Sequence, residues 1–265
     1  MGRFKLSALI GAALLATPLA GALAADYPEP YVPVDIGHQW YLRGDIGMAA
    51  QHLRTLDHVL FATATDFVWL DRGNFDAAPT FGLGVGFRHN DRLRFDLTGQ
   101  YRGKASFSAL DQFFNETDVE TQTNDYTGKK SEFLFLANGY YDFAAWHGII
   151  PYVGAGVGVS YNMISNFRDT NVIAGGGGYA GTGGKLNLAW ALHAGASMQV
   201  TDALTIDLGY SFISLGDAQT GILYNLDGTC TACQPMYFRG LTSHDLKLGV
   251  RWAFDHNNYP IVAKY

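Results

Sequence analysis

Three adjacent residues near the end of the chain, Ser243, His244 and Asp245, carry the groups of a hydrolytic triad: a nucleophile, a base and an acid. A triad needs these groups hydrogen-bonded in series. If this segment is a strand, Ser243 and Asp245 point to one face and His244 to the other. Neighbours on opposite faces cannot form that series, so the sequence predicts no catalytic set and a protein that is not an enzyme.

The chain contains two cysteines, Cys230 and Cys233. In the cytosol this spacing would suggest redox or zinc chemistry, whereas in an exported protein it favours a local disulfide inside a loop. No second pair of cysteines or histidines lies near enough in the sequence to complete a zinc site. We therefore expect no bound metal.

Two glycine-rich stretches do not match nucleotide-binding motifs. Residues 82–86 read Gly-x-Gly-x-Gly, but the helix that follows a dinucleotide fingerprint is missing. Residues 183–185 read Gly-Gly-Lys, but Leu186 stands where a phosphate loop needs Ser or Thr to bind the metal. We therefore expect no cofactor.

The elements that must position these side chains are strands. Eight stretches alternate apolar and polar residues over roughly ten positions, which is typical of a strand with one apolar and one polar face. In the last stretch Leu246, Leu248, Val250, Trp252 and Phe254 share one face. The expected strands cover about residues 40–49, 80–88, 93–102, 131–143, 150–161, 186–200, 204–213 and 241–254.

The composition favours a membrane environment for these strands. The chain is 48% hydrophobic and only 16% charged, against about 25% charged in a typical soluble domain. After the N-terminal region no stretch offers the ~18 consecutive apolar residues of a membrane helix, whereas a barrel strand needs only ~9–11 residues. The predicted fold class is all-β: an eight-stranded antiparallel transmembrane β-barrel of the outer-membrane type with four long extracellular loops.

The first residues have the features of a secretory signal. Two basic residues precede an apolar run over 6–16, and an Ala-x-Ala cleavage site follows. We expect cleavage after Ala24 or Ala25. The chain then divides into a signal peptide (1–25), a periplasmic N-terminal segment (26–39), the barrel (40–254) and a C-terminal tail (255–265).

The connections between the expected strands alternate in length. They run long, short, long, short, long, short and long along the chain. In an antiparallel ring every second connection lies at the same end, so the four long ones share one end. The three short ones share the other end with the chain termini. This is the outer-membrane rule of short periplasmic turns and long extracellular loops.

Charged residues concentrate on the faces expected to point inward. Six acids balance six bases there, and buried charges are costly unless they are paired. An ion-selective pore would show rings of one sign, and eight strands leave an interior only wide enough for side chains. We predict a plugged lumen with a network of ion pairs. Its members are Arg43, Asp45, Arg88, Arg94, Asp96, Arg102, Glu132, Asp142, Asp207, Asp245, Lys247 and Arg251.

Glycines recur at inward positions of two strands. They occupy positions 82, 84 and 86 of one strand and positions 154, 156 and 158 of another. They either leave room for large side chains of the strand across the barrel or ease the curvature of the sheet. Both interpretations remain open.

The first long connection, about 51–79, is unusually apolar for an extracellular segment. It either exposes a contact patch or folds over the barrel mouth, and the sequence favours neither. Its apolar residues are Leu53, Leu56, Val59, Leu60, Phe61, Phe67, Val68, Trp69 and Leu70.

Several short runs resemble those of one protein family. Residues 93–102 (LRFDLTGQYR), 138–142 (NGYYD) and 151–158 (PYVGAGVG) follow residues 40–45 (WYLRGD) in the family's order. The chain resembles the Omp25/Omp31-like and opacity-like outer-membrane surface proteins of alphaproteobacteria over most of its mature length. The resemblance implies structural and host- or surface-contact roles, and some members are described as porins or haem binders.

The last strand ends in two aromatic residues, Trp252 and Phe254, which we interpret as the C-terminal signal for the barrel assembly machinery. The chain departs from the general outer-membrane pattern here, because eleven residues, 255–265, follow Phe254.

We predict a non-catalytic outer-membrane protein with an envelope-integrity and surface-recognition role. The alternatives are a narrow porin-like channel, a barrel that binds a small ligand of the haem type, or a lipid A-modifying enzyme. The expected partners are outer-membrane lipid and lipopolysaccharide, the assembly machinery, and extracellular or host surface ligands. Removal of the signal leaves 16 basic against 24 acidic residues, which argues against a nucleic-acid partner.

Overall fold

The computed structural model describes residues 39–62, 64–115, 120–171, 173 and 175–254. The expected signal peptide, nearly all of the expected periplasmic segment and the tail 255–265 lie outside these residues. Within the described part, no helix is long and apolar enough to cross a membrane. The helix η1 (Val59–Ala62) is a single short turn.

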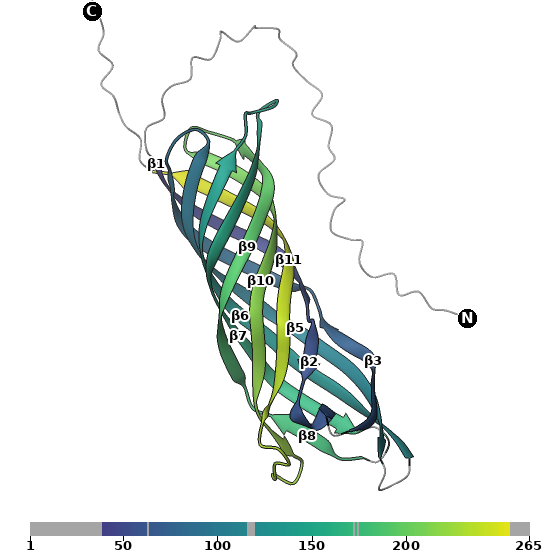
Figure 1. Cartoon of the computed structure of the whole chain (residues 1–265). Coiled ribbons are helices and arrows are strands. Elements are labelled where there is room, and N and C mark those ends of the chain that lie inside the picture. Colours follow the sequence, from purple (N-terminus) through teal and green to yellow (C-terminus); the bar gives the residue numbers. More distant parts are fainter. Residues whose placement is uncertain (1–38, 63, 116–119, 172, 174, 255–265) are drawn as a thin grey trace, which may run out of the picture. The chain divides into compact units, whose positions relative to one another are not determined.

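Eight long strands form a closed antiparallel ring (Figure 1). Each strand pairs with the next, and the last returns to the first, with Tyr41 opposite Ala253. This is the predicted eight-stranded barrel. Its strands are β1 (Gln39–His52), β4 (Ala78–Arg88), β5 (Leu93–Asn115), β6 (Glu120–Asp142), β7 (Ile149–Asn171), β9 (Gly183–Gln199), β10 (Leu204–Asn225) and β11 (Pro235–Ala253).

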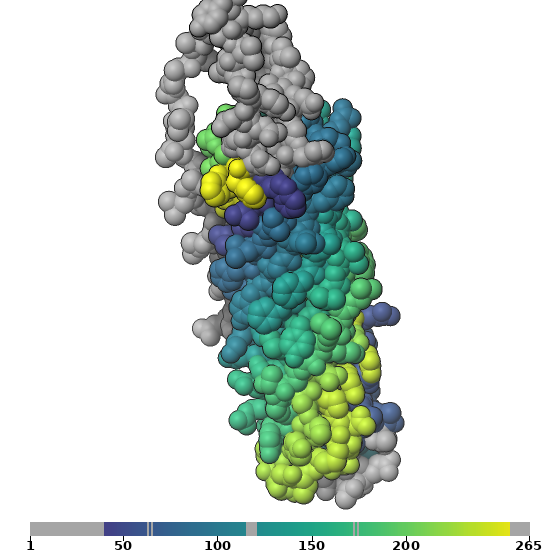
Figure 2. Space-filling view, turned by 90° about the vertical axis from the view of Figure 1, so that its left-hand side faces the viewer, coloured from purple at the N-terminus to yellow at the C-terminus, as the bar shows by residue number. Residues whose placement is uncertain are grey.

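Alternating burial along each strand separates an apolar outer wall from the interior. On β6, Phe133 and Phe135 face outward, whereas Glu132 and Asn138 are buried. Glu132 therefore lies inward, as the predicted charge network requires. Figure 2 shows the side chains of this wall over β4, β5 and β6. Large apolar side chains on its outer face, such as Leu188 at 74% exposure, fit a lipid environment.

The four long connections share one end, as predicted, but most of their residues form strands rather than loops. β5 continues to Asn115 and β6 begins at Glu120, so the expected loop over 103–129 is a hairpin that prolongs the barrel. The hairpin of β10 and β11 prolongs the wall in the same way.

The sequence pattern inverts where the wall extends beyond the membrane-facing band. Past a register shift between Arg102 and Ala105, Phe107 is buried whereas Ser106 and Ser108 are exposed. A wall that meets water on its outside buries its apolar face inside. A prediction that requires apolar residues on the outward face therefore places the end of these strands too early in the sequence.

Three short strands complete the wall at the end of the barrel where the four long connections lie (Figure 1). β2 (Thr55–Asp57) pairs with β11, and β3 (Thr65–Phe75) pairs with β5, beyond the ends of β1 and β4. β8 (Gly177–Ala180) pairs with both β7 and β10 beyond the end of β9. The expected first loop therefore contributes two strands to the wall.

The apolar residues of this first connection divide between the two predicted roles, an exposed patch and a segment folded over the barrel mouth. Leu53, Phe61 and Trp69 pack against the buried core, as expected of a segment folded over the mouth. Val68 and Leu70, at 52% and 53% exposure, face outward from β3. The segment therefore closes the barrel and also presents an apolar patch.

The interior changes from charged to apolar along the barrel. Charged residues fill the half nearer the short turns, and aromatic and aliphatic residues fill the half nearer the long connections. There the ring of Phe238 contacts those of Phe75, Phe107 and Phe167, with centroids 6.0, 5.0 and 6.1 Å away. The sequence predicted the charged half alone.

The inward glycines make room for side chains of adjacent strands. A Cβ at Gly86 would overlap the ring of Tyr41 on β1, and a Cβ at Gly154 would overlap Tyr140 on β6. The large partner thus comes from the neighbouring strand, not from the strand across the barrel as the first interpretation assumed.

Candidate functional site

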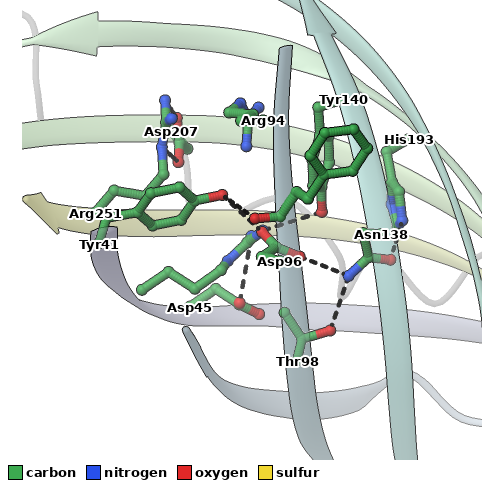
Figure 3. A network of polar contacts seen from close by, with 12 residues as sticks. Tyr41, Asp45, Arg94, Asp96, Thr98, Asn138, Tyr140, His193, Asp207 and Arg251 are labelled. Carbon is green, nitrogen blue, oxygen red and sulfur yellow. Dashed lines mark hydrogen bonds and ion pairs between the residues drawn. The ribbon is translucent and has the colours of Figure 1, made fainter. Parts of the chain in front are cut away.

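Asp96 lies at the centre of the polar network in the lumen (Figure 3). Arg43 Nη1 donates to Asp96 Oδ2 at 2.7 Å, and Asn138 Nδ2 donates to Asp96 Oδ1 at 2.7 Å. Arg43 also lies 3.5 Å from Asp45 and donates to the Tyr140 hydroxyl at 3.0 Å. Side chains from β1, β5 and β6 thus cross-link the barrel through its centre.

Two further ion pairs lie nearer the short turns. Arg94 Nε is 3.0 Å from the carboxylate of Asp142, and its guanidinium lies 4.0 Å from the centroid of the Tyr140 ring. Arg251 Nε donates to Asp207 Oδ2 at 2.7 Å. Each of these four charged side chains therefore has a partner of opposite sign.

The middle of the lumen holds a cluster that is closed to solvent. Arg102, Lys130 and Glu132 have exposures of 0%, 1% and 0%. Glu132 forms an ion pair with Arg102 and another with Lys130. Arg102 also pairs with Asp245, which lies 3.5 Å from Lys247. This cluster spans the tube between β5, β6 and β11.

The structure adds one residue to the predicted network and leaves another at its margin. Lys130 was not predicted, although it stands two positions before Glu132 and so shares its inward face. Arg88 is half-buried and has no carboxylate within salt-bridge distance among the residues that the structure describes. The other eleven predicted members each form an ion pair.

The three adjacent triad residues lie on both sides of the wall. Ser243 Oγ donates to Asp245 Oδ1 at 2.6 Å inside the lumen. His244 is exposed on the outer face, where its Nδ1 lies 2.6 Å from the Tyr210 hydroxyl. The histidine inside the lumen, His193, bonds to Ser211 and Asn138. None of these contacts forms the series that a triad requires.

Little space remains between the lumen side chains. One cavity of about 20 Å³ lies among Arg43, Asn138 and Lys247. A second of about 20 Å³ lies beside Tyr41 and Arg88. Each has room for about one water molecule.

A larger cavity lies at the end where the long connections gather. It measures about 400 Å³, within the range of small-molecule sites. Phe61 and Phe67, whose rings stack 4.8 Å apart, line it from the connection between β1 and β4. Asp111 on β5, Tyr126 on β6 and Asp169 on β7 also line it, as do Leu223 on β10 and Met236 on β11.

The two carboxylates of this cavity differ in their hydrogen bonds. Asp111 accepts from the Tyr126 hydroxyl at 2.6 Å and from the backbone N–H of Asn124 at 3.0 Å. Asp169 Oδ1 is buried and has no hydrogen-bond partner in the described structure. Burial, and secondly the charge of Asp111, raises the pKa of Asp169 to about 7. Asp169 is thus divided between its neutral and charged forms near neutral pH.

At the tip of the hairpin between β10 and β11, Cys230 and Cys233 are joined in a disulfide. It closes a short local loop and lies outside the cavity lining.

Comparison with known proteins decides the family. The sequence model described as "Outer membrane protein beta-barrel domain" matches residues 9–254. The chain belongs to this family. The Omp25-like resemblance is consistent with that membership, and the protein is located in the bacterial outer membrane.

Relatives of this outer-membrane barrel occur in other bacteria. An uncharacterized protein of Brucella suis is 27% identical, over 91% of this chain and 95% of its own length. A Rickettsia felis protein named "Putative adhesin" is 27% identical, over 83% and 89%. Among solved structures, Neisserial surface protein A has a TM-score of 0.42 at 17% identity and covers 82% of this chain and 99% of its own.

Membership fixes the orientation of this outer-membrane barrel. The short turns face the periplasm, and the 400 Å³ cavity lies at the extracellular end. Trp252 faces the lipid at the periplasmic rim, and the backbone N–H of Phe254 donates to the Trp40 carbonyl at 3.2 Å. The proposed assembly signal is thus part of the ring closure.

Sequence reasoning missed the extracellular cavity. Asp111, Tyr126 and Asp169 lie in segments that were expected to be loops, so no inward face was assigned to them. The aromatic residues of the first connection were the one available signal, because a water-facing loop has no reason to be so apolar.

Proposed function

We propose that this outer-membrane barrel is a non-catalytic surface-recognition protein with a closed lumen, and that its extracellular end makes the functional contacts. The observation that carries the proposal is the filling of the lumen by two consecutive layers. The charged layer is cross-linked by ion pairs, and the apolar core lies beyond it. A rigid, closed barrel also supports a role in envelope integrity.

The closed lumen argues against the channel alternative. An open channel needs a continuous path for water and ions. Here Arg102 on β5 reaches Asp245 on β11 through the interior, and neither side chain has exposed surface. Phe238 is fully buried in the tube on the extracellular side. The separation of His244 from Ser243 and Asp245 supports a non-catalytic role.

The extracellular end offers the surface for contact. Val68 and Leu70 stand two positions apart on β3, so they share its outward face, and both are about half exposed. Apolar side chains exposed together are typical of interaction sites. The name of the Rickettsia felis relative is in keeping with such a role.

We expect the double variant Val68→Asp, Leu70→Asp to lower the adhesion of bacteria displaying this protein to cultured host cells by roughly tenfold or more, since charges at an apolar contact must be desolvated. The measurement is a count of bound bacteria relative to bacteria without the protein.

Ile173→Asp is the matched control, because Ile173 is 52% exposed on another connection. This variant should adhere like the wild type. If the double variant adheres as well as the wild type, Val68 and Leu70 do not form the contact surface. Wild-type adhesion no greater than that of bacteria without the protein would overturn the surface-recognition role.

A further inference from the structure

We propose that the extracellular cavity binds an organic cation: an ammonium group on an aromatic or branched alkyl body. The inference goes beyond the cell-contact role and does not depend on it. It rests on the size of the cavity, its aromatic walls and the two carboxylates that share it.

The carboxylates lack a basic partner. The described lining residues include neither lysine nor arginine, and His58 is the one basic side chain among them. Asp111 is held by Tyr126 and Asn124, whereas Asp169 Oδ1 accepts no hydrogen bond. A buried carboxylate without a partner takes up a proton or a cation. An ammonium group would supply both the charge and the missing donor.

The aromatic walls suit the rest of such a ligand. Five aromatic side chains line the cavity: Phe61, Phe67, Phe113, Phe114 and Tyr126. The ring centroid of Tyr126 lies 6.2 Å from that of Phe61, and the rings of Phe61 and Phe67 stack at 4.8 Å. The faces of aromatic rings attract cations as well as apolar groups.

Other ligand classes fit less well. A metal ion is disfavoured because the described residues contain no group of three or more metal-ligating side chains. An anion would be repelled by Asp111 and Asp169. A neutral aromatic molecule would fit the walls but would leave Asp169 without a partner, so the experiment must separate charge from shape.

The test uses the full folded chain in lipid nanodiscs and equilibrium dialysis, with 2-phenylethylammonium as the cation and 2-phenylethanol as its uncharged counterpart. Empty nanodiscs give the background. The wild type should bind the cation about tenfold or more tightly than the alcohol. Asp169→Asn should weaken cation binding by about 10- to 100-fold and leave alcohol binding unchanged.

Asp125→Asn is the matched control, because Asp125 is an exposed carboxylate on β6 beside Tyr126. It should bind the cation like the wild type. A second variant, Phe67→Leu, removes an aromatic wall without changing the charge and should also weaken cation binding. This variant keeps the test decisive if Asp169→Asn fails to fold.

Cation affinity should also rise from about pH 5 to about pH 8, because Asp169 loses its proton near pH 7. The other titratable groups facing the cavity are Asp111, Tyr126 and His58. Burial raises the pKa of Tyr126 and lowers that of His58. Tyr126 therefore stays neutral, and a protonated His58 would weaken binding in the same direction.

The pH dependence should be largely lost in Asp169→Asn and kept in His58→Asn. Cation binding that is no tighter than alcohol binding, or equal cation binding by the wild type and Asp169→Asn, would overturn the proposal. The first result would leave a site selective for shape alone.

Discussion

Replacement of Glu132 by Gln should lower the free energy of unfolding by about 3–5 kcal/mol, because it leaves a buried base without its carboxylate. Glu132 is fully buried between Arg102 and Lys130. In this variant Arg102 would keep its ion pair with Asp245. Lys130, at 1% exposure, would keep its hydrogen bond to the side-chain oxygen of Gln51, at 2.8 Å. The measurement is equilibrium unfolding in urea in phospholipid vesicles, followed by tryptophan fluorescence.

A double variant separates the ion pair from general disruption of the core. Adding Lys130→Met to Glu132→Gln removes the unpaired charge and should recover a large part of the lost stability, since the two residues are energetically coupled. Arg88→Gln is the control, because Arg88 is half-buried and outside the ion pairs; it should cost less than about 1 kcal/mol. Purely additive losses at positions 130 and 132 would contradict the pairing.

Replacement of Phe238 by Ala should lower the free energy of unfolding by about 3–5 kcal/mol, through lost burial and the cavity left behind. Phe238 is fully buried and touches three other phenylalanine rings that come from β3, β5 and β7. The same urea unfolding experiment measures the loss.

Phe81→Ala is the matched control for the core, since Phe81 is 52% exposed on the lipid-facing wall of β4. Its loss should be clearly smaller. A Phe238→Ala cost no larger than that of Phe81→Ala would mean that the extracellular half has no packed apolar core.

The membrane-spanning half of the barrel was predictable from the sequence because its environment is the same for every strand. Lipid outside and polar groups inside impose one alternation, so Arg94, Asp142 and Arg251 could be assigned inward without any contact information. Which acid pairs with which base was not predictable, because the pairing depends on the stagger of neighbouring strands. The three residues nevertheless lie where the alternation placed them.

The extracellular half could not be predicted in the same way. There the wall meets water, and Phe107 and Phe238 point inward where the membrane rule would have placed apolar side chains outward. The cavity depends on five long strands and one connection that meet only in the folded chain. Asp111 and Asp169, 58 positions apart in the numbering of the chain, gave no local signal of their proximity.

The central claim, that the lumen is closed and the protein acts from its extracellular end, is tested most directly by single-channel recording of the purified barrel in a planar lipid bilayer. We predict no stable conductance steps for the wild type. Neutralisation of Arg94 or Arg251 should reduce stability without opening a selective pore. Steady open steps in the wild type, with ion selectivity that changes when either arginine is neutralised, would contradict the account.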